Sequence, residues 1–314
     1  MKGAVLAVAA LAAILAAPAQ AADVRVGKGN PTAFTFTPVD IGKEYGIFQK
    51  HGLNVEITSF AGATRIHQGM AADQIDIGLA SGPDMVFVAK GSPVKAVANM
   101  AGPPLLIGLG VRPDGSVTNV AQMKDRTVGV TTLGSLTWWL PREVARLQGW
   151  GTEGIETVQV NSTPGMIAAL KTKQVDGVTT DSVTVYNIVE EGSGRILVKF
   201  GDSVKDFHVH VIYASDKLIQ SNPDGLKAFL AGWMETIRFM RDNKAKAIDM
   251  AAQKTGVSKA VAAEGYNDTM PILSTTGHFE AKALDVLATS FVDTKLLPDK
   301  PDMSKLLTEA YLPK

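Results

Sequence analysis

The chain of 314 residues is 46% hydrophobic and 20% charged, which is enough to build one large or two medium globular domains with apolar cores. Its 31 basic and 31 acidic residues cancel, so the charge balance gives no reason to expect nucleic acid as a partner. Cysteine is absent, which excludes disulfides, thiolate chemistry and lipid attachment through a cysteine.

The segment 1–21 has the pattern of a cleavable signal peptide. A basic start precedes an apolar run over 4–17, Pro18 ends that run, and 19–21 (Ala-Gln-Ala) is a small-x-small cleavage site. The alternative is a transmembrane anchor, but a run of 14 residues (4 to 17) is shorter than the roughly 20 that span a bilayer. We therefore expect a mature chain that begins at Ala22 or Asp23, exported to the periplasm as a soluble protein.

The first part of the mature chain alternates between strand and helix patterns. Strands are predicted at 24–26, 54–60, 75–79 and 94–100, and helices at 38–51, 62–72 and 83–89. Strands that alternate with helices at this spacing predict βαβ units and a largely parallel sheet.

A second series of alternating strand and helix patterns follows. Strands are predicted at 105–111, 127–131, 157–160, 175–179 and 196–200, and helices at 135–148 and 163–173. The segment "MAADQIDIG" (70–78) resembles "LKTKQVDGV" (170–178), and in both places the strand runs into hydroxyl and acidic residues. This internal repeat predicts two similar α/β lobes.

The chain then returns to the first lobe. A strand is predicted at 207–214, followed by helices at 223–243, 244–254, 259–267 and 281–292. The extended segments 105–111 and 208–213 bracket the second lobe, and we expect them to be hinge strands at two crossovers. The predicted division is 22–106 and 212–314 for the first lobe and 107–211 for the second.

Ligands of open parallel sheets lie outside the carboxyl ends of the strands. Five small, polar turns meet that description, and several precede a helix, whose free amides suit an anionic group such as a sulfonate or carboxylate. The candidate ligand-binding residues are Asn30, Phe36, Thr37, Gly62, Ala63, Ser81, Gly82, Gly134, Ser135, Thr137, Thr180, Asp181 and His208.

Several of these residues have a structural alternative. Ser81, Ser135 and Thr137 have the residue types that cap helices, and Asp181 can equally accept from a ligand or cap the next helix. Arg65 can pair with an anion or lie in solvent. His208 and His210 share one face of a strand, which can indicate a metal, but two ligands without a third favour packing or cleft lining.

No catalytic or cofactor motif stands out. Gly-x-Ser-x-Gly and the Walker motif are absent, and "GKGNPT" (27–32) lacks the third glycine of a dinucleotide loop. Ser135 has no sequence partner that identifies a base. The sequence therefore predicts neither an enzyme nor a resident cofactor or metal.

Five segments together resemble a known family. They are "PVDIGKEYGIFQKHGLNVEITSFAGA" (38–63), "GMAADQIDIGLASG" (69–82), "VGVTTLGS" (128–135) with Gly149 closing the helix, "AALKTKQVDG" (168–177) and "NPDGLKAFLAGWMETIRFM" (222–240). In order and spacing they are similar to the periplasmic substrate-binding proteins of ABC importers in the nitrate/sulfonate/taurine class, with the NMT1/THI5-like fold. The chain departs from that pattern at Asp73 and Lys173, where the family usually has glycine, and it lacks the cysteine-rich signature of the pyrimidine-synthesising relatives.

The resemblance implies a two-lobed type II binding protein with two hinge crossovers. Such a protein would be a monomer that captures a small organic anion, aromatic acids included, between its lobes and delivers it to a permease with a separate ATPase. The resemblance also implies that Trp138 reaches the ligand, while Trp139 packs inward because neighbouring helical residues are about 100° apart. Pro141 is expected either to kink the helix or to delay its start. The alternatives are a ligand-sensing input protein for a membrane receptor and an exported enzyme on the same fold.

Overall fold

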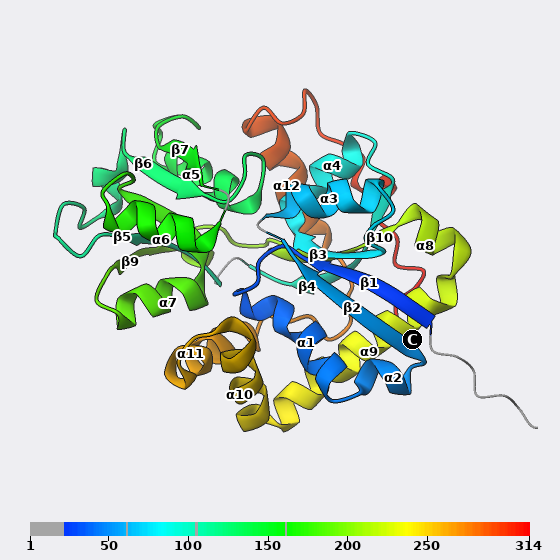
Figure 1. Cartoon of the computed structure of the whole chain (residues 1–314). Helices are drawn as coiled ribbons and strands as arrows, with labels where there is room; N and C mark the ends of the chain where they lie inside the picture. Colours follow the sequence, from blue (N-terminus) through cyan, green and yellow to red (C-terminus); the bar gives the residue numbers. More distant parts are fainter. Residues whose placement is uncertain (1–21, 61, 104–105, 161) are drawn as a thin grey trace, which may run out of the picture.

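The computed structural model describes residues 22–60, 62–103, 106–160 and 162–314, and it shows two α/β lobes (Figure 1). The predicted signal peptide, 1–21, lies outside the described residues. The two lobes are built on two separate five-stranded sheets flanked by helices, which confirms the predicted two-lobed α/β fold.

The sheet of the first lobe has the strand order β2-β1-β3-β10-β4. Its strands are β1 (Ala22–Lys28), β2 (Leu53–Ser59), β3 (Ile77–Ser81), β4 (Val94–Ala101) and β10 (His210–Ser215). β1 pairs in parallel with β2 and β3, whereas β10 is antiparallel to both β3 and β4. β1, β2, β3 and β4 therefore run the same way, and β10 runs against them.

The sheet of the second lobe repeats this plan in the order β7-β6-β8-β5-β9. Its strands are β5 (Ile107–Val111), β6 (Thr127–Val130), β7 (Glu156–Gln159), β8 (Gly177–Asp181) and β9 (Arg195–Lys199). Here β5 is the strand that runs against the others. The matching strand orders confirm the internal repeat predicted from 70–78 and 170–178.

The chain crosses between the lobes after β4 and after β9. β5 and β10, the first strands after each crossing, are the two antiparallel strands. The predicted lobe boundary at 106/107 falls at the start of β5, and the one at 211/212 falls inside β10. Since β10 pairs along its whole length with the first sheet, the second crossing lies before His210.

The helices cover both sheets. The first lobe has α1 (Thr37–Glu44), α2 (Ile47–Lys50), α3 (Ala63–Ala71), α4 (Met85–Ala89), α8 (Asp216–Ser221), α9 (Pro223–Asp242), α10 (Lys244–Thr255), α11 (Lys259–Thr269) and α12 (Ala281–Asp293); the second has α5 (Leu136–Leu147), α6 (Thr163–Lys171) and α7 (Ser182–Glu190). Short 3-10 turns are η1 (Phe34–Phe36), η2 (Gly82–Asp84), η4 (Val120–Met123), η5 (Phe200–Asp202) and η6 (Met303–Lys305). None of the helices in the described residues has the length and apolar character needed to cross a bilayer.

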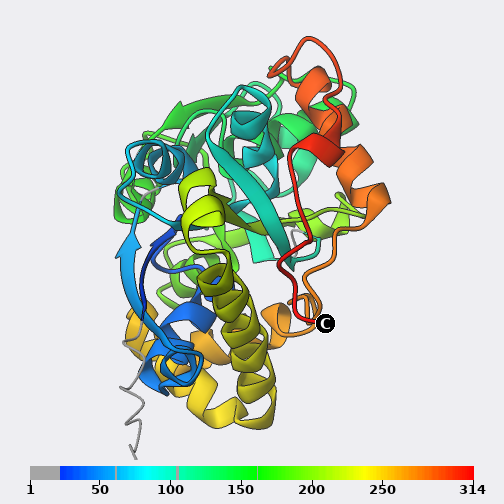
Figure 2. The ribbon, with the colours of Figure 1, turned by 90° about the vertical axis from the view of Figure 1, so that its right-hand side faces the viewer.

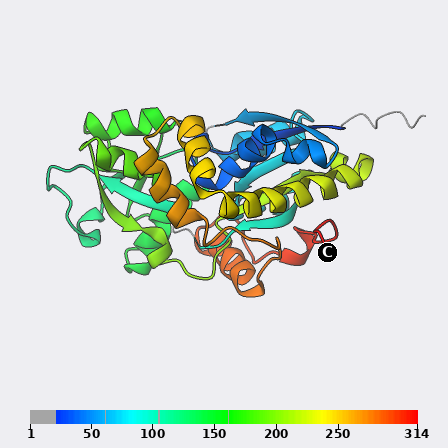
Figure 3. The ribbon, with the colours of Figure 1, turned by 90° about the horizontal axis from the view of Figure 1, so that it is seen from below.

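The long helix α9 packs along the first lobe (Figure 2). It packs against α1 and α2, and Phe229 of α9 stacks on Phe48 of α2 with ring centroids 5.1 Å apart. Seen from below, α10 and α11 extend from α9 toward the second lobe, where α11 contacts α7 (Figure 3). The carboxyl-terminal segment covers the edge strand β4, because Leu307 bridges to Ala96. An edge that is covered in this way is protected from pairing with another chain.

Several element predictions were wrong, and the short helix α8 (Asp216–Ser221) was not predicted. The single helix at 38–51 is two helices, because Gly46 adopts the left-handed conformation (φ 66°) between them. β3 and β8 begin two residues later than predicted, since the residues before them form turns that close α3 and α6. α7 was missed because Val183, Thr184 and Val185 are β-branched, which disfavours a helix locally.

Candidate ligand-binding site

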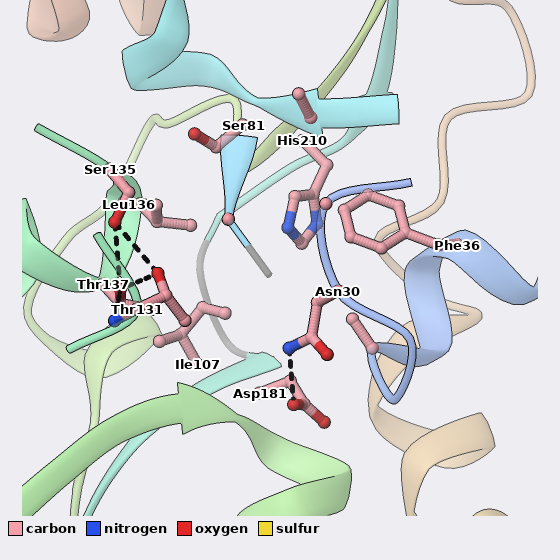
Figure 4. Close-up of a pocket in the computed structure, with 14 residues that line it drawn as sticks. Asn30, Phe36, Ser81, Ile107, Thr131, Ser135, Leu136, Thr137, Asp181 and His210 are labelled. Atoms are coloured by element: carbon pink, nitrogen blue, oxygen red, sulfur yellow. Dashed lines mark hydrogen bonds between the residues drawn. The ribbon is translucent and has the colours of Figure 1, made fainter. Parts of the chain in front are cut away.

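A cavity lies between the two lobes where the carboxyl ends of their parallel strands meet (Figure 4). About 450 Å³ of space, part of it open to solvent, lies between its lining residues. Its lining residues are Gly29, Asn30, Ala33, Phe36, Gly62, Ala80, Ser81, Ile107, Thr131, Ser135, Leu136, Thr137, Asp181 and His210. This is the place where open α/β sheets bind their ligands, and both lobes contribute to it.

The second lobe presents the start of α5 to the cavity. The hydroxyls of Thr131 and Thr137 are 2.7 Å apart, and the Ser135 hydroxyl donates to the Thr132 carbonyl at 2.7 Å. Ser135 occupies the N-cap position, but its side chain makes no capping hydrogen bond to the helix. Among the described residues, no side chain accepts from the first-turn amides of α5, and the Trp138 amide donates to the Ser135 carbonyl at 3.1 Å.

The first lobe presents the start of α3. Gly62 is the N-cap residue of this helix, has a φ of 95° and offers no side chain as a cap. A Cβ placed on Gly62 would lie 2.7 Å from the Thr132 Oγ1 of the other lobe. Glycine thus lets the N-terminus of α3 approach the second lobe closely, so that two uncapped helix N-termini from opposite lobes border one cavity.

Asp181 joins the two lobes beneath the cavity. Its Oδ2 accepts hydrogen bonds from Asn30 Nδ2 and Thr32 Oγ1, both at 2.9 Å, and from Thr184 Oγ1 at 2.8 Å. Its Oδ1 accepts from the Thr184 amide at 3.0 Å and so caps α7. The capping interpretation of Asp181 is confirmed, and a contact with ligand stays a prediction.

His210 forms part of the cavity wall opposite this bridge. It pairs in register with Ser81 of β3, and its ring is tilted against Phe36 with centroids 4.6 Å apart. The side chain is 5% exposed, and Nδ1 has no hydrogen-bond partner among the described residues. Burial lowers the pKa of His210 to about 3, so the ring is neutral at physiological pH.

A buried acid lies behind Ser81. Asp84 Oδ2 accepts from the Ser81 amide at 2.7 Å and from its hydroxyl at 2.6 Å. Burial raises the pKa of Asp84 to about 7, against the lowering effect of the two Ser81 hydrogen bonds. The Ser81 hydroxyl proton is directed at Asp84, so its oxygen is the acceptor available to the cavity.

The cavity wall carries no cationic side chain. Among its described lining residues there is no lysine or arginine, and Asp181 is the one acid. Within the same described part of the chain, no three histidine, cysteine, aspartate or glutamate side chains are grouped so that they could hold a metal ion. Any negative charge in this cavity would be stabilised by amide and hydroxyl donors.

The comparisons with known proteins agree with this architecture. A sequence profile of the family described as NMT1/THI5 like matches residues 33–247. The chain belongs to this family. A comparison with curated protein sequences finds no relative of the chain.

Solved structures share the fold of this NMT1/THI5-like chain at low sequence identity. The alkanesulfonate-binding protein SsuA from Xanthomonas axonopodis pv. citri, bound to MOPS, has a TM-score of 0.81 at 17% identity, covering 93% of this chain and 99% of that one. The periplasmic aliphatic sulphonate-binding protein SsuA from Escherichia coli has 0.75 at 17%, covering 91% and 97%. The periplasmic nitrate-binding protein NrtA from Synechocystis PCC 6803 has 0.72 at 18%, covering 93% and 87%.

Half of the candidate residues of the NMT1/THI5-like chain line the cavity. They are Asn30, Phe36, Gly62, Ser81, Ser135, Thr137 and Asp181. Whether they bind a ligand stays a prediction. Arg65 is exposed and lies outside the lining, as the solvent alternative predicted.

Four other candidates support the backbone around the cavity. The Thr37 hydroxyl donates to the Phe34 carbonyl at 2.7 Å, and the Thr180 hydroxyl donates to Asp181 at 3.2 Å. Gly82 allows a close backbone approach, since a Cβ there would lie 1.9 Å from the His208 carbonyl oxygen. Gly134 has a φ of 78° and forms the turn before α5. Ala63 begins α3, and its side chain lies outside the described part.

The structure places Trp138 and His208 away from the cavity lining. The guanidinium of Arg142 lies over the Trp138 ring, 4.3 Å from its centroid. His208 Nε2 accepts from the Glu280 amide at 3.0 Å. Trp139 packs inward, as predicted, and stacks on Phe207. α5 is regular from Leu136 onward, so Pro141 does not delay its start.

Sequence reasoning missed several lining residues. His210 was considered with His208, but the alternation of a strand places both on one face and cannot decide which of them reaches the cavity. Leu136 lies within the predicted turn at 134–137, Thr131 ends the strand predicted before that turn, and Ile107 starts the hinge strand β5. The signal for Thr131 and Leu136 was their place in or near that turn.

Proposed function

We propose that this protein is a solute receptor, not an enzyme, which binds a small organic anion between its lobes. The observation that carries the proposal is the pair of uncapped helix N-termini, α3 and α5, which border one cavity from opposite lobes. Side chains cap some of the other helices, for example α6 by Ser162, α9 by Asn222 and α11 by Ser258. The helices α1, α2, α4, α10 and α12 also have no side-chain cap, so it is the position of α3 and α5 on opposite sides of one cavity that supports the proposal. Free first-turn amides and the helix dipole stabilise a negative group such as a sulfonate or carboxylate.

Binding between the lobes couples ligand capture to closure. The bridge from Asp181 to Asn30 and Thr32 and the approach of Gly62 to Thr132 are contacts between lobes. A ligand that touches both α3 and α5 therefore stabilises the closed arrangement relative to an open one.

The closed complex is the form that we propose is delivered to an ABC permease and its ATPase. Two observations support this role. The pattern at 1–21 is that of a signal peptide for export to the periplasm. The solved structures that share the fold include periplasmic binding proteins for sulfonate and nitrate. We propose that the receptor is a monomer. The alternative role is to present the ligand to a sensing membrane protein, and neighbouring genes for a sensor kinase in place of a permease would favour it.

The direct test is calorimetric titration of the mature chain, 22–314, with alkanesulfonates, aromatic carboxylates and nitrate. We expect saturable binding of at least one of these anions, with compaction of the protein in small-angle scattering. Failure of every anion to bind would contradict the proposal, and turnover of a bound anion would favour an enzyme.

A matched pair of variants at Leu136 tests the amide donors. The Leu136 amide has no hydrogen-bond partner among the described residues, and proline is well tolerated at the first helical position. Leu136→Pro removes that N–H, whereas Leu136→Ala loses the same packing and keeps it. We expect the proline variant to bind the anion at least about tenfold more weakly than the alanine variant, because a hydrogen bond to a charged group contributes about 1.5–3 kcal/mol. Equal affinities would show that this amide does not bind the anion.

A further inference from the structure

A second, larger cavity adjoins the first one. About 970 Å³ of space, part of it open to solvent, lies between its lining residues, which include Gly29, Asn30 and Thr131 of the cavity between the lobes. Two cavities that share three lining residues are neighbouring chambers of one cleft.

Segments that are far apart in the chain form the walls of the second chamber. The loop after β1 contributes Pro31 and Thr32, and the end of β2 contributes Ser59, with Phe60 after it. The second lobe contributes Thr131 and residues of α6 and α7, and the turn between α10 and α11 closes the outer side. That turn is held across the lobes, because the Ser258 hydroxyl donates to Glu190 Oε1 of α7 at 2.9 Å. The chamber is therefore formed when the lobes are closed.

The lining of this chamber carries no charge. No described residue that lines it is acidic, basic or a histidine. Its apolar members are Pro31, Phe60, Pro164, Ile167 and Val257, all of them partly or well exposed. The other lining residues are two glycines and nine uncharged serine, threonine and asparagine residues. Such a wall favours an uncharged, apolar group over the anionic head that α3 and α5 favour, since apolar contact is gained without desolvating a charge.

Asn30 and Thr32 stand at the boundary between the two chambers. Asn30 lines both, and Thr32 Oγ1 contacts Thr184 Oγ1 at 3.0 Å beside the Asp181 bridge. A ligand that is held by its head at α3 and α5 would pass Asn30 to reach Phe60 and Val257.

We propose that the second chamber binds the uncharged apolar tail, aryl or branched alkyl, of a ligand whose anionic head occupies the first chamber. This rests on the proposed function, because the head positions the tail. The preferred solutes are then elongated organic anions, and short anions of the same head group bind more weakly.

The test compares two ligands with the same head and different tails. Ethanesulfonate and 4-phenylbutane-1-sulfonate, with propionate and 5-phenylvalerate as a carboxylate pair, are titrated calorimetrically against the mature chain. We expect the longer member of at least one pair to bind at least about tenfold more tightly, because the buried tail removes apolar surface from water.

Variants that fill the chamber locate the tail. Val257→Trp should abolish the advantage of the longer ligand and change the affinity of the shorter one less than about twofold. Val189→Trp, the same change at an exposed site on α7 outside both chambers, should bind both ligands as the unaltered protein does. If Val257→Trp does not fold, Thr255→Trp in the same turn serves instead.

The outcomes separate the two proposals. Equal binding of long and short anions, or a Val257→Trp variant that weakens both alike, would overturn the tail chamber and leave the anion receptor intact. Failure of all four anions to bind would overturn the tail chamber, and failure of the aromatic carboxylates and nitrate as well would overturn the anion receptor.

Discussion

Ser81, which lines the cavity, is held in place by hydrogen bonds to the buried carboxyl group of Asp84. Asp84 is fully buried, its Oδ2 holds both the amide and the hydroxyl of Ser81, and its Oδ1 has no partner among the described residues. A carboxyl with so few donors is disfavoured in its ionised form, which is why burial raises its pKa to about 7.

Asp84 should therefore make stability depend on pH. The carboxyl titrates near pH 3.8 in the unfolded chain and near 7 in the folded one, so its contribution to stability is fully present below about pH 4 and lost as pH rises to about 7. Asp84→Asn does not ionise. We expect its free energy of unfolding, relative to that of the unaltered protein, to increase by about 4 kcal/mol between pH 4 and pH 8.

Urea denaturation of both proteins across that pH range measures the difference. Other titrating groups are common to the two proteins and cancel in the subtraction. Parallel stability curves would show that Asp84 is not protonated in the folded protein at pH 6.

At the scale of the element, the repeated helix–turn–strand unit explains why 70–78 and 170–178 are alike. Asp76 accepts the Arg25 amide at 2.9 Å, and Asp176 accepts the Thr127 amide at 3.2 Å. Each aspartate thereby fastens its turn to a neighbouring strand of its own lobe, β1 in the first lobe and β6 in the second. The aspartate has the same place in both copies of the motif because in each lobe it accepts this hydrogen bond from a strand amide.

The same turns explain why the resemblance described above implies glycine at the positions of Asp73 and Lys173. Both residues adopt a positive φ, 57° and 61°, just after α3 and α6. That conformation costs an L-residue about 1–2 kcal/mol, whereas glycine adopts it freely.

Lys173→Gly should therefore stabilise the protein by about 0.5–1 kcal/mol, after the greater flexibility of glycine in the unfolded chain is subtracted. Asp73→Gly relieves the same conformation but loses the side-chain contacts with Arg25 and Lys217, so its gain should be smaller. Urea denaturation of the two variants checks the order. A destabilised Lys173→Gly variant would contradict this account.

Local patterns predicted most elements but not all of them. The period-2 run at 54–60 and the helical pattern at 223–243 lie within one or two residues of β2 and α9. α7 was missed because its own residues do not favour a helix. It is stabilised by the N-cap residue Asp181, which lies just before the segment, and by packing against α11. The packing is a tertiary contact, which the residues of the segment do not show.

At the scale of the whole molecule, Gly62 and Thr132 set how closely the lobes approach. Gly62→Ala would place a Cβ 2.7 Å from Thr132 Oγ1 and strain a residue with φ 95°. We expect the variant to bind anions at least about tenfold more weakly and to be less compact in small-angle scattering with ligand, because closure is hindered.

A second substitution separates the clash from other effects. Thr132→Ala removes the Oγ1 and Cγ2 atoms that lie closest to the added Cβ. In the Gly62→Ala/Thr132→Ala double variant, compaction and part of the affinity should return, while the backbone strain at residue 62 remains. An unchanged deficit in the double variant would show that the approach of the two lobes at this point does not limit closure.

The sequence alone determined the α/β class, the two repeated lobes and the strand-end turns that carry the site, since these depend on local periodicity and turn chemistry. Asn30, Ser81 and Ser135 were found because each sits in such a turn.

Only the tertiary structure decided which neighbours reach the cavity. His210 lines it and His208 does not, because β10 pairs with β3 from residue 210 onward. Trp138 lies beside Arg142, the Asp181 bridge spans two lobes, and the uncharged chamber is assembled from segments that are far apart in the chain. The register of strands and the apposition of lobes are set by contacts between residues far apart in the chain, which local pattern does not encode.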